Sequence, residues 1–249
     1  MNLVADAPVA TIVLLPGMDG TGKLFQHWIA AKPPGYELSA LAYPAGEALA
    51  YAELAQRVRA ALPRDRPYFL LAESFSGPLG LMLSAEVPPG LRGLILCCSF
   101  AKGPLPFPAL FKPLVALFGF AAQPAVLARL GHRALFGRFA GSDTFNALSD
   151  ALRGLRAPVL RSRLRAVLAV DATPLLARVT LPVLYLQAKD DRVVPPRALR
   201  HLRQFLPHMQ VARIAAPHML LQTAPAEAWR AVLPFVGNVP AVAAKQDRN

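Results

Sequence analysis

Residues 68–77 read Tyr68-Phe69-Leu70-Leu71-Ala72-Glu73-Ser74-Phe75-Ser76-Gly77. The apolar start of this stretch is typical of a buried strand, and a helical pattern follows from Gly77 to Glu86. Ser74 therefore falls at a strand-to-helix turn, with small residues two positions to either side. A turn of this kind, a nucleophile elbow, presents a serine side chain above the edge of a sheet. The alternative is a serine that only caps the helix.

Short apolar runs alternate with helical patterns along most of the chain. The expected strands are Thr11–Leu15, Tyr36–Tyr43, Tyr68–Ala72, Gly93–Cys98, Pro182–Gln187 and Gln210–Ile214. The expected helices include Tyr51–Leu62, Gly77–Glu86, Pro196–Phe205 and Ala226–Phe235. This alternation predicts an α/β fold, with a mostly parallel central sheet of about six strands that helices cover on both faces.

The alternation is interrupted between Cys98 and Pro182, where no clear strand pattern occurs. Around Leu160, Leu164 and Leu168 the apolar residues recur on one face of a helix. We interpret residues 102–174 as a helical cap, inserted into a core that residues 1–101 and 175–249 form.

The composition favours a globular protein with a large core, because 54% of its 249 residues are hydrophobic. No run reaches the roughly 18 to 20 apolar residues of a membrane span, and the N-terminus lacks the pattern of a signal peptide. We therefore expect a cytoplasmic protein. The adjacent Cys97 and Cys98 are interpreted as small core residues, since neighbouring cysteines seldom form a disulfide and no further metal ligands stand at suitable spacing.

The formal net charge of +12 is concentrated in the expected cap. Residues 102–165 contain ten basic and two acidic side chains. Arg153, Arg156, Arg161 and Arg165 form either a solvated face or a docking surface for an acidic partner. Nucleic-acid binding is disfavoured, because basic and aromatic residues do not interleave and no known binding module is recognised.

Two residues further along the chain complement Ser74. A serine hydroxyl needs a base within hydrogen-bond reach to become a good nucleophile. His218 follows the expected strand Gln210–Ile214, and Asp191 follows the expected strand Pro182–Gln187, with Asp190 as its rival. Both therefore lie at the carboxyl edge of the sheet, in the order serine, acid, histidine.

The segment Leu14-Leu15-Pro16-Gly17-Met18-Asp19-Gly20-Thr21-Gly22 follows the first expected strand. A phosphate-binding loop is the competing interpretation, but Leu24 stands where that motif requires serine or threonine. We prefer an oxyanion loop, in which the backbone N–H groups of Met18 and Phe75 face a developing negative charge. Asp19 is expected to hold the shape of this loop.

With these elements in this order, the chain resembles the α/β-hydrolase fold family over nearly its whole length. The resemblance implies Ser74 as nucleophile, Asp191 as acid and His218 as base, with Met18 and Phe75 as oxyanion donors. It also implies that the cap shapes an acyl pocket. The chain departs from the family at Ala72 and Ser76, where glycines are usual, and at Pro16, where a histidine often stands.

The residues and the resemblance together predict a serine carboxylesterase that hydrolyses acyl esters through an acyl-enzyme on Ser74. We expect no metal and no organic cofactor, and a monomer or weak homo-oligomer. Thioesterase, acyltransferase, perhydrolase and lactonase activities remain open, as does a binding protein without turnover.

A narrower similarity concerns the carrier-linked substrate. In size and in having a basic helical cap, the chain is similar to the pimeloyl-carrier-protein methyl ester carboxylesterases of biotin synthesis. That similarity implies that Arg153, Arg156, Arg161 and Arg165 hold an acidic acyl carrier protein. Among the cap aromatics, Phe107 and Phe111 either line an acyl tunnel or pack the cap on the body.

Overall fold

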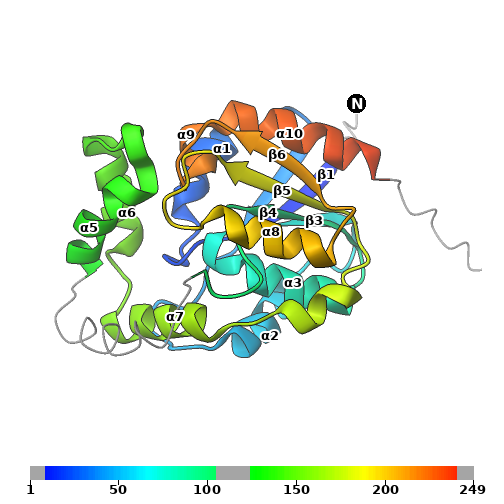
Figure 1. Cartoon of the computed structure of the whole chain (residues 1–249), viewed down its shortest axis with the longest axis horizontal. Helices are drawn as coiled ribbons and strands as arrows, with labels where there is room; N and C mark the ends of the chain where they lie inside the picture. The colour runs from blue at the N-terminus through cyan, green and yellow to red at the C-terminus, as the bar shows by residue number, and fades with distance from the viewer. Residues whose placement is uncertain (1–8, 105–123, 240–249) are drawn as a thin grey trace, which may run out of the picture.

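The computed structural model describes residues 9–104 and 124–239 of the chain. Its centre is a sheet of six strands in the order β2-β1-β3-β4-β5-β6, and every neighbouring pair is parallel (Figure 1). The strands are β1 (Ala10–Leu15), β2 (Tyr36–Ala40), β3 (Tyr68–Glu73), β4 (Leu91–Cys97), β5 (Val183–Ala188) and β6 (Gln210–Ile214). The predicted α/β fold with a parallel sheet of six strands is therefore confirmed.

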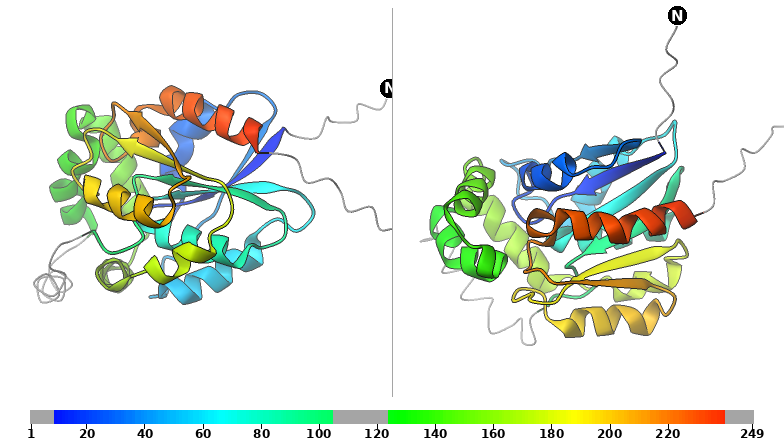
Figure 2. Two further views of the ribbon diagram at one scale, coloured as in Figure 1. Left: turned by 45° about the vertical axis from the view of Figure 1, so that its right-hand side comes forward. Right: turned by 90° about the horizontal axis from the view of Figure 1, so that it is seen from above.

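Helices cover both faces of the sheet, as the continuous apolar strands require. On one face lie α1 (Gln26–Ala30), α9 (Leu220–Thr223) and α10 (Pro225–Asn238), and on the other lie α2 (Tyr51–Ala61), α3 (Gly77–Glu86) and α8 (Pro196–Phe205) (Figures 1 and 2). Strand β1 serves both layers: Val13 packs with the α2 side, whereas Ile12 packs with the α10 side. Alternate side chains of one strand thus enter two separate hydrophobic cores.

The strand predictions hold for all six strands: β6 has the predicted ends, and each of the other five differs from its prediction at one end or both. Strand β2 was expected to reach Tyr43 but ends at Ala40. Beyond that point the chain follows the glycine loop instead of the sheet edge, because the Tyr43 N–H donates to the carbonyl of Gly20 at 2.6 Å. This departure brings the Tyr43 side chain, which is 6% exposed, under the elbow of Ser74.

Between β4 and β5 the chain forms α5 (Pro124–Phe136), α6 (Ser142–Leu152) and α7 (Ala157–Ala169). Helices α5 and α6 stand beyond the end of the sheet toward which β5 points (Figure 1). The two ends of this segment are tied together where it leaves the body: Lys102 and Asp171 form an antiparallel bridge and an ion pair of 2.8 Å. These helices occupy the segment predicted to be a cap; its boundaries at 102 and 174 remain a prediction.

Within residues 9–104 and 124–239, no helix combines the length and the apolar character needed to cross a membrane. Phe107 and Phe111, which were expected either to line an acyl tunnel or to pack the cap on the body, lie outside the described residues.

Candidate active site

Ser74 occupies a strained turn between β3 and α3. Its φ angle of 49° lies in the left-handed region, which residues other than glycine rarely adopt. A short 3-10 segment, Ser74–Ser76, joins the strand to the helix. The Ser99 hydroxyl donates a hydrogen bond of 2.5 Å to the Ser74 carbonyl, so a neighbouring loop holds the turn in place. Strain that the surroundings impose on one residue is a frequent property of functional sites.

Two glycines of the elbow and of helix α3, Gly77 and Gly80, have no room for a side chain. A Cβ atom on Gly77 would lie 1.7 Å from Ser99 Oγ, so no larger residue fits there while the turn keeps its shape. A Cβ on Gly80 would lie 2.9 Å from the Ala72 Cβ atom, which places α3 directly on β3. The close approach of α3 to β3 and to Ser99 therefore depends on Gly77 and Gly80.

The structure brings the three residues predicted as a catalytic triad into hydrogen-bond contact. His218 Nε2 lies 2.9 Å from Ser74 Oγ, and His218 Nδ1 lies 3.0 and 2.9 Å from the two carboxylate oxygens of Asp191. The His218 side chain is only 3% exposed and that of Asp191 only 7%. With its proton on Nδ1, the imidazole donates to Asp191 and presents Nε2 to accept the serine proton.

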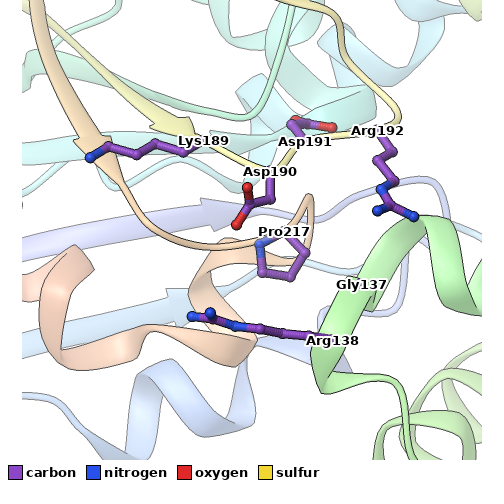
Figure 3. A pocket seen from close by; sticks show the side chains of 7 residues that line it. All are labelled: Gly137, Arg138, Lys189, Asp190, Asp191, Arg192 and Pro217. Atoms are coloured by element: carbon purple, nitrogen blue, oxygen red, sulfur yellow. The ribbon is translucent and has the colours of Figure 1, made fainter.

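Asp191, rather than its rival Asp190, meets the histidine. Asp191 Oδ1 also accepts the N–H groups of Val193 and Val194, at 2.8 and 2.9 Å, which fixes the carboxylate. Asp190 is exposed and its carboxylate points to the other side of the loop, into a hollow at the seam with Gly137 and Arg138 of the inserted segment (Figure 3). The order of the two carboxyl groups along the loop thus decides which of them reaches the imidazole.

The glycine loop is held by its own hydrogen bonds beside Ser74. The Gly20 N–H donates to the carbonyl of Gly17 at 3.0 Å, and Asp19 Oδ2 accepts from both the N–H and the hydroxyl of Thr21. These bonds agree with the interpretation of Asp19 as a residue that shapes the loop. Met18 lines the cavity above Ser74.

Phe75 directly follows Ser74 in the elbow, and its side chain is turned away from the cavity. Its ring stacks on Tyr51 at 4.9 Å, and its carbonyl accepts the Tyr51 hydroxyl at 2.7 Å. The role of the Met18 and Phe75 N–H groups as oxyanion donors stays a prediction.

A mainly apolar cavity of about 280 Å³ opens over Ser74 and His218. Body and inserted helices share its walls: Leu24 and Met219 come from the body, and Leu135, Leu148, Leu152, Leu160 and Leu164 come from α5, α6 and α7. A leucine-lined space beside a nucleophilic serine suits an acyl chain or another apolar group.

Glu73 is a member of this site that the sequence did not single out. Its side chain lines the cavity next to Ser74 and accepts a hydrogen bond of 3.0 Å from Gln222 Nε2. Burial raises the pKa of the Glu73 carboxyl to about 7, although the bond from Gln222 opposes the shift. Only the fold brings Gln222 to Glu73, so the sequence carried no signal for this pair.

Cys98 lies close to the Asp191 carboxylate and the His218 ring, within 4.8 Å between potential ligand atoms. The three donors form the only arrangement in the described residues that resembles a metal site. Burial raises the pKa of the Cys98 thiol, which keeps sulfur protonated and a poor ligand. Both nitrogen atoms of His218 are already engaged. The donor set therefore suits proton transfer better than metal binding.

The four arginines predicted to bind a partner do not enter the cavity. Arg153 forms an ion pair with Asp150 of α6. Arg156 and Arg165 are exposed, and Arg161 is partly buried. The neighbour that the prediction omitted, Arg163, is buried against the body.

Comparisons with known proteins agree with the fold. The family model described as alpha/beta hydrolase fold matches residues 29–225. A comparison with curated proteins finds no match. Among solved structures, an esterase from Exiguobacterium antarcticum is 14% identical with a TM-score of 0.80, and 93% of each chain is covered. The enol-lactonase of Burkholderia xenovorans LB400 is 18% identical with a TM-score of 0.78, covering 95% of this chain and 94% of its own.

A third similar structure, the esterase RhEst1 of Rhodococcus sp. ECU1013, is 20% identical with a TM-score of 0.71 and covers 93% of this chain and 91% of its own. At such identities the likeness concerns the fold alone.

Proposed function

This chain belongs to the alpha/beta hydrolase fold family, and we propose that it is a serine carboxylesterase that hydrolyses acyl esters through a covalent intermediate on Ser74. One observation carries the proposal: the Ser74 hydroxyl, the His218 ring and the Asp191 carboxylate form a continuous hydrogen-bonded chain at the floor of an apolar cavity. The structural similarity to esterases from Exiguobacterium antarcticum and Rhodococcus sp. ECU1013 agrees with this reaction class.

In this mechanism, Ser74 Oγ attacks the ester carbonyl while His218 Nε2 takes the serine proton. Asp191 stabilises the resulting imidazolium, and the N–H groups of Met18 and Phe75 stabilise the oxyanion. His218 then gives its proton to the leaving alcohol, and the acyl group stays on Ser74. Water, deprotonated by His218, attacks this acyl-enzyme, releases the acid and restores the serine.

The test is hydrolysis of p-nitrophenyl esters from acetate to palmitate, with the Ser74→Ala variant alongside. We expect turnover by the native protein and its loss in the variant, while both have the same circular dichroism spectrum. Turnover that survives in folded Ser74→Ala protein would contradict the proposal.

A carrier-linked acyl ester is the narrower candidate for the substrate. Among the described residues no acidic side chain forms an ion pair with Arg156 or Arg165, and both are exposed. They are therefore available to an acidic carrier. Replacing both by glutamate should lower turnover of a carrier-bound methyl ester about tenfold or more and leave the free methyl ester unaffected. Equal effects on the two substrates would remove this candidate.

A further inference from the structure

Helix α7 places one arginine in the body of the protein instead of in solvent. Arg163 is 2% exposed, although Arg165 on the same helix is exposed. Burial of a guanidinium is costly unless hydrogen bonds replace its hydration. Its partners therefore indicate what the buried charge does.

The Arg163 guanidinium binds main-chain carbonyl groups around the glycine loop. Nη1 donates to the carbonyls of Met18 and Asp19, at 2.8 and 2.9 Å, and Nη2 donates to the carbonyl of Pro44 at 3.2 Å. The two carbonyls that Nη1 binds belong to the peptide groups directly after the Met18 N–H. Their orientation constrains the direction in which that N–H points, because successive peptide planes share only two soft dihedral angles.

The loop is built to admit this side chain. A Cβ atom on Gly20 would lie 2.3 Å from Arg163 Nη1, so only glycine leaves room for the guanidinium there. Gly20 also has a φ angle of 69°, which favours glycine. On the other side the guanidinium lies over the Tyr43 ring, at 5.7 Å from its centroid.

Tyr43 continues the contact network to the elbow. The Ser76 hydroxyl donates to the carbonyl of Pro16, which uses its only proton, so it accepts the hydrogen bond from the Tyr43 hydroxyl at 2.6 Å. The glycine loop is thus held at its start by Ser76 of the elbow and at its turn by Arg163 of α7.

We propose that Arg163 is a positioning residue, which reaches from the inserted segment to the glycine loop and holds the Met18 N–H toward the oxyanion that forms during attack by Ser74. Helix α7 consequently stays docked on the body during turnover. The inference rests on the proposed hydrolase function and assigns the inserted segment a part in the chemical step, in addition to lining the cavity.

The test compares Arg163→Met, which removes the donors, and Arg163→Lys, which keeps the charge without the planar fork. Exposed Arg133 of α5 supplies the matched control, Arg133→Met. Kinetics with p-nitrophenyl butyrate are expressed per active serine, counted with a fluorophosphonate probe. We expect Arg163→Met to lower kcat about 10²-fold with KM changed less than threefold, since one oxyanion donor contributes about 10²–10³ to kcat. Arg163→Lys should recover part of the loss, and Arg133→Met should match the native protein.

A second measurement separates positioning from folding. The rate at which the fluorophosphonate labels Ser74 also depends on a stabilised phosphoryl oxygen, so it should fall in Arg163→Met in proportion to kcat. If the variant has fewer active serines, each as fast as in the native protein, Arg163 supports only folding and the inference is overturned.

The same assays distinguish failure of the inference from failure of the proposed function. A native protein that neither hydrolyses esters nor reacts with the probe would overturn both. If native turnover is normal and Arg163→Met is equally fast per active serine, only the inference fails. If the native protein reacts with the fluorophosphonate probe but does not hydrolyse these esters, the labelling rates of the Arg163 variants alone test the inference. A rate in Arg163→Met equal to the native rate would then overturn it.

Discussion

The hydroxyl of Tyr43 donates to the hydroxyl of Ser76 at 2.6 Å, and Ser76 in turn donates to the carbonyl of Pro16. Both side chains are buried. This pair accounts for the serine at a position where the family usually has glycine: its hydroxyl links the elbow, the glycine loop and the segment after β2.

Removing the hydroxyl of either Tyr43 or Ser76 should lower the stability of the protein. Ser76→Ala leaves the buried Tyr43 hydroxyl and the Pro16 carbonyl without their partner, which costs about 1–3 kcal/mol for an unsatisfied buried group. We expect Ser76→Ala and Tyr43→Phe each to lower the free energy of unfolding in urea by this order. The double variant should lose less than the sum, because the second change removes a group already orphaned. Strictly additive losses would mean that the two hydroxyls are not coupled.

The choice between the two neighbouring carboxyl groups predicts unequal kinetic effects. Asp191→Asn retains an oxygen for the Val193 and Val194 N–H groups but favours the wrong tautomer of His218. It should lower kcat about 10⁴-fold while the protein remains folded. Asp190→Asn, the matched control one residue earlier, should change kcat less than about twofold, since Asp190 does not contact His218. Steady-state hydrolysis of p-nitrophenyl butyrate checks this, and similar losses in the two variants would refute the assignment.

Glu73 should make stability depend on pH. Its folded pKa of about 7 lies above its ordinary value of 4.5, so between these pH values the native state binds more protons than the unfolded state. Stability is therefore full below about pH 4.5 and is lost as pH rises toward 7, by about 3 kcal/mol in all at 1.36 kcal/mol per pKa unit.

Replacement by glutamine removes the titration and keeps the size. Urea unfolding between pH 4.5 and 8 should show a smaller decline in Glu73→Gln than in the native protein. Glu227→Gln, at an exposed carboxyl paired with Arg230, should keep the native slope. An unchanged slope in Glu73→Gln would show that its carboxyl does not titrate in this range.

The leucines of the inserted helices should set the preferred acyl length. Leu164 is partly buried at the cavity wall, so a larger side chain there shortens the cavity. In the native protein, kcat/KM should rise about fourfold per added methylene until the cavity is filled, from about 0.8 kcal/mol per buried methylene. Leu164→Trp should end this rise at a shorter ester and leave acetate turnover unchanged. The same chain-length profile in both proteins would show that the acyl chain binds elsewhere.

Local patterns predicted the strands well, because each strand of a doubly covered sheet is a short apolar run with turn residues at its ends. The predicted C-terminal end of β2 was wrong for a tertiary reason. Tyr43 continues the strand pattern in the sequence, but its N–H donates to the carbonyl of Gly20 and its ring packs against Phe75 of the elbow. An edge strand pairs on one side only, so competing contacts shorten it easily.

In the candidate site, too, some residues could be predicted from local patterns and others only from the fold. The contact among Ser74, Asp191 and His218 could be predicted because each residue follows a strand end, and parallel strands bring their carboxyl ends to one edge of the sheet. No local pattern distinguished Glu73, because its burial depends on the fold and its partner Gln222 lies 149 residues away on another element. Arg163 could not be distinguished from the other arginines of α7 in the sequence. Helical periodicity does not show which arginine binds carbonyl groups 119 to 145 residues away.

The sequence alone determined the fold family, the parallel sheet and the order of Ser74, Asp191 and His218 at its strand ends, since those follow from hydrophobic periodicity and from motifs at strand ends. The tertiary structure decided which carboxylate meets His218, which groups the Ser76 hydroxyl binds, how burial raises the pKa of Glu73 and where Arg163 is buried. These depend on distances between segments far apart in the chain, and no local pattern encodes such distances.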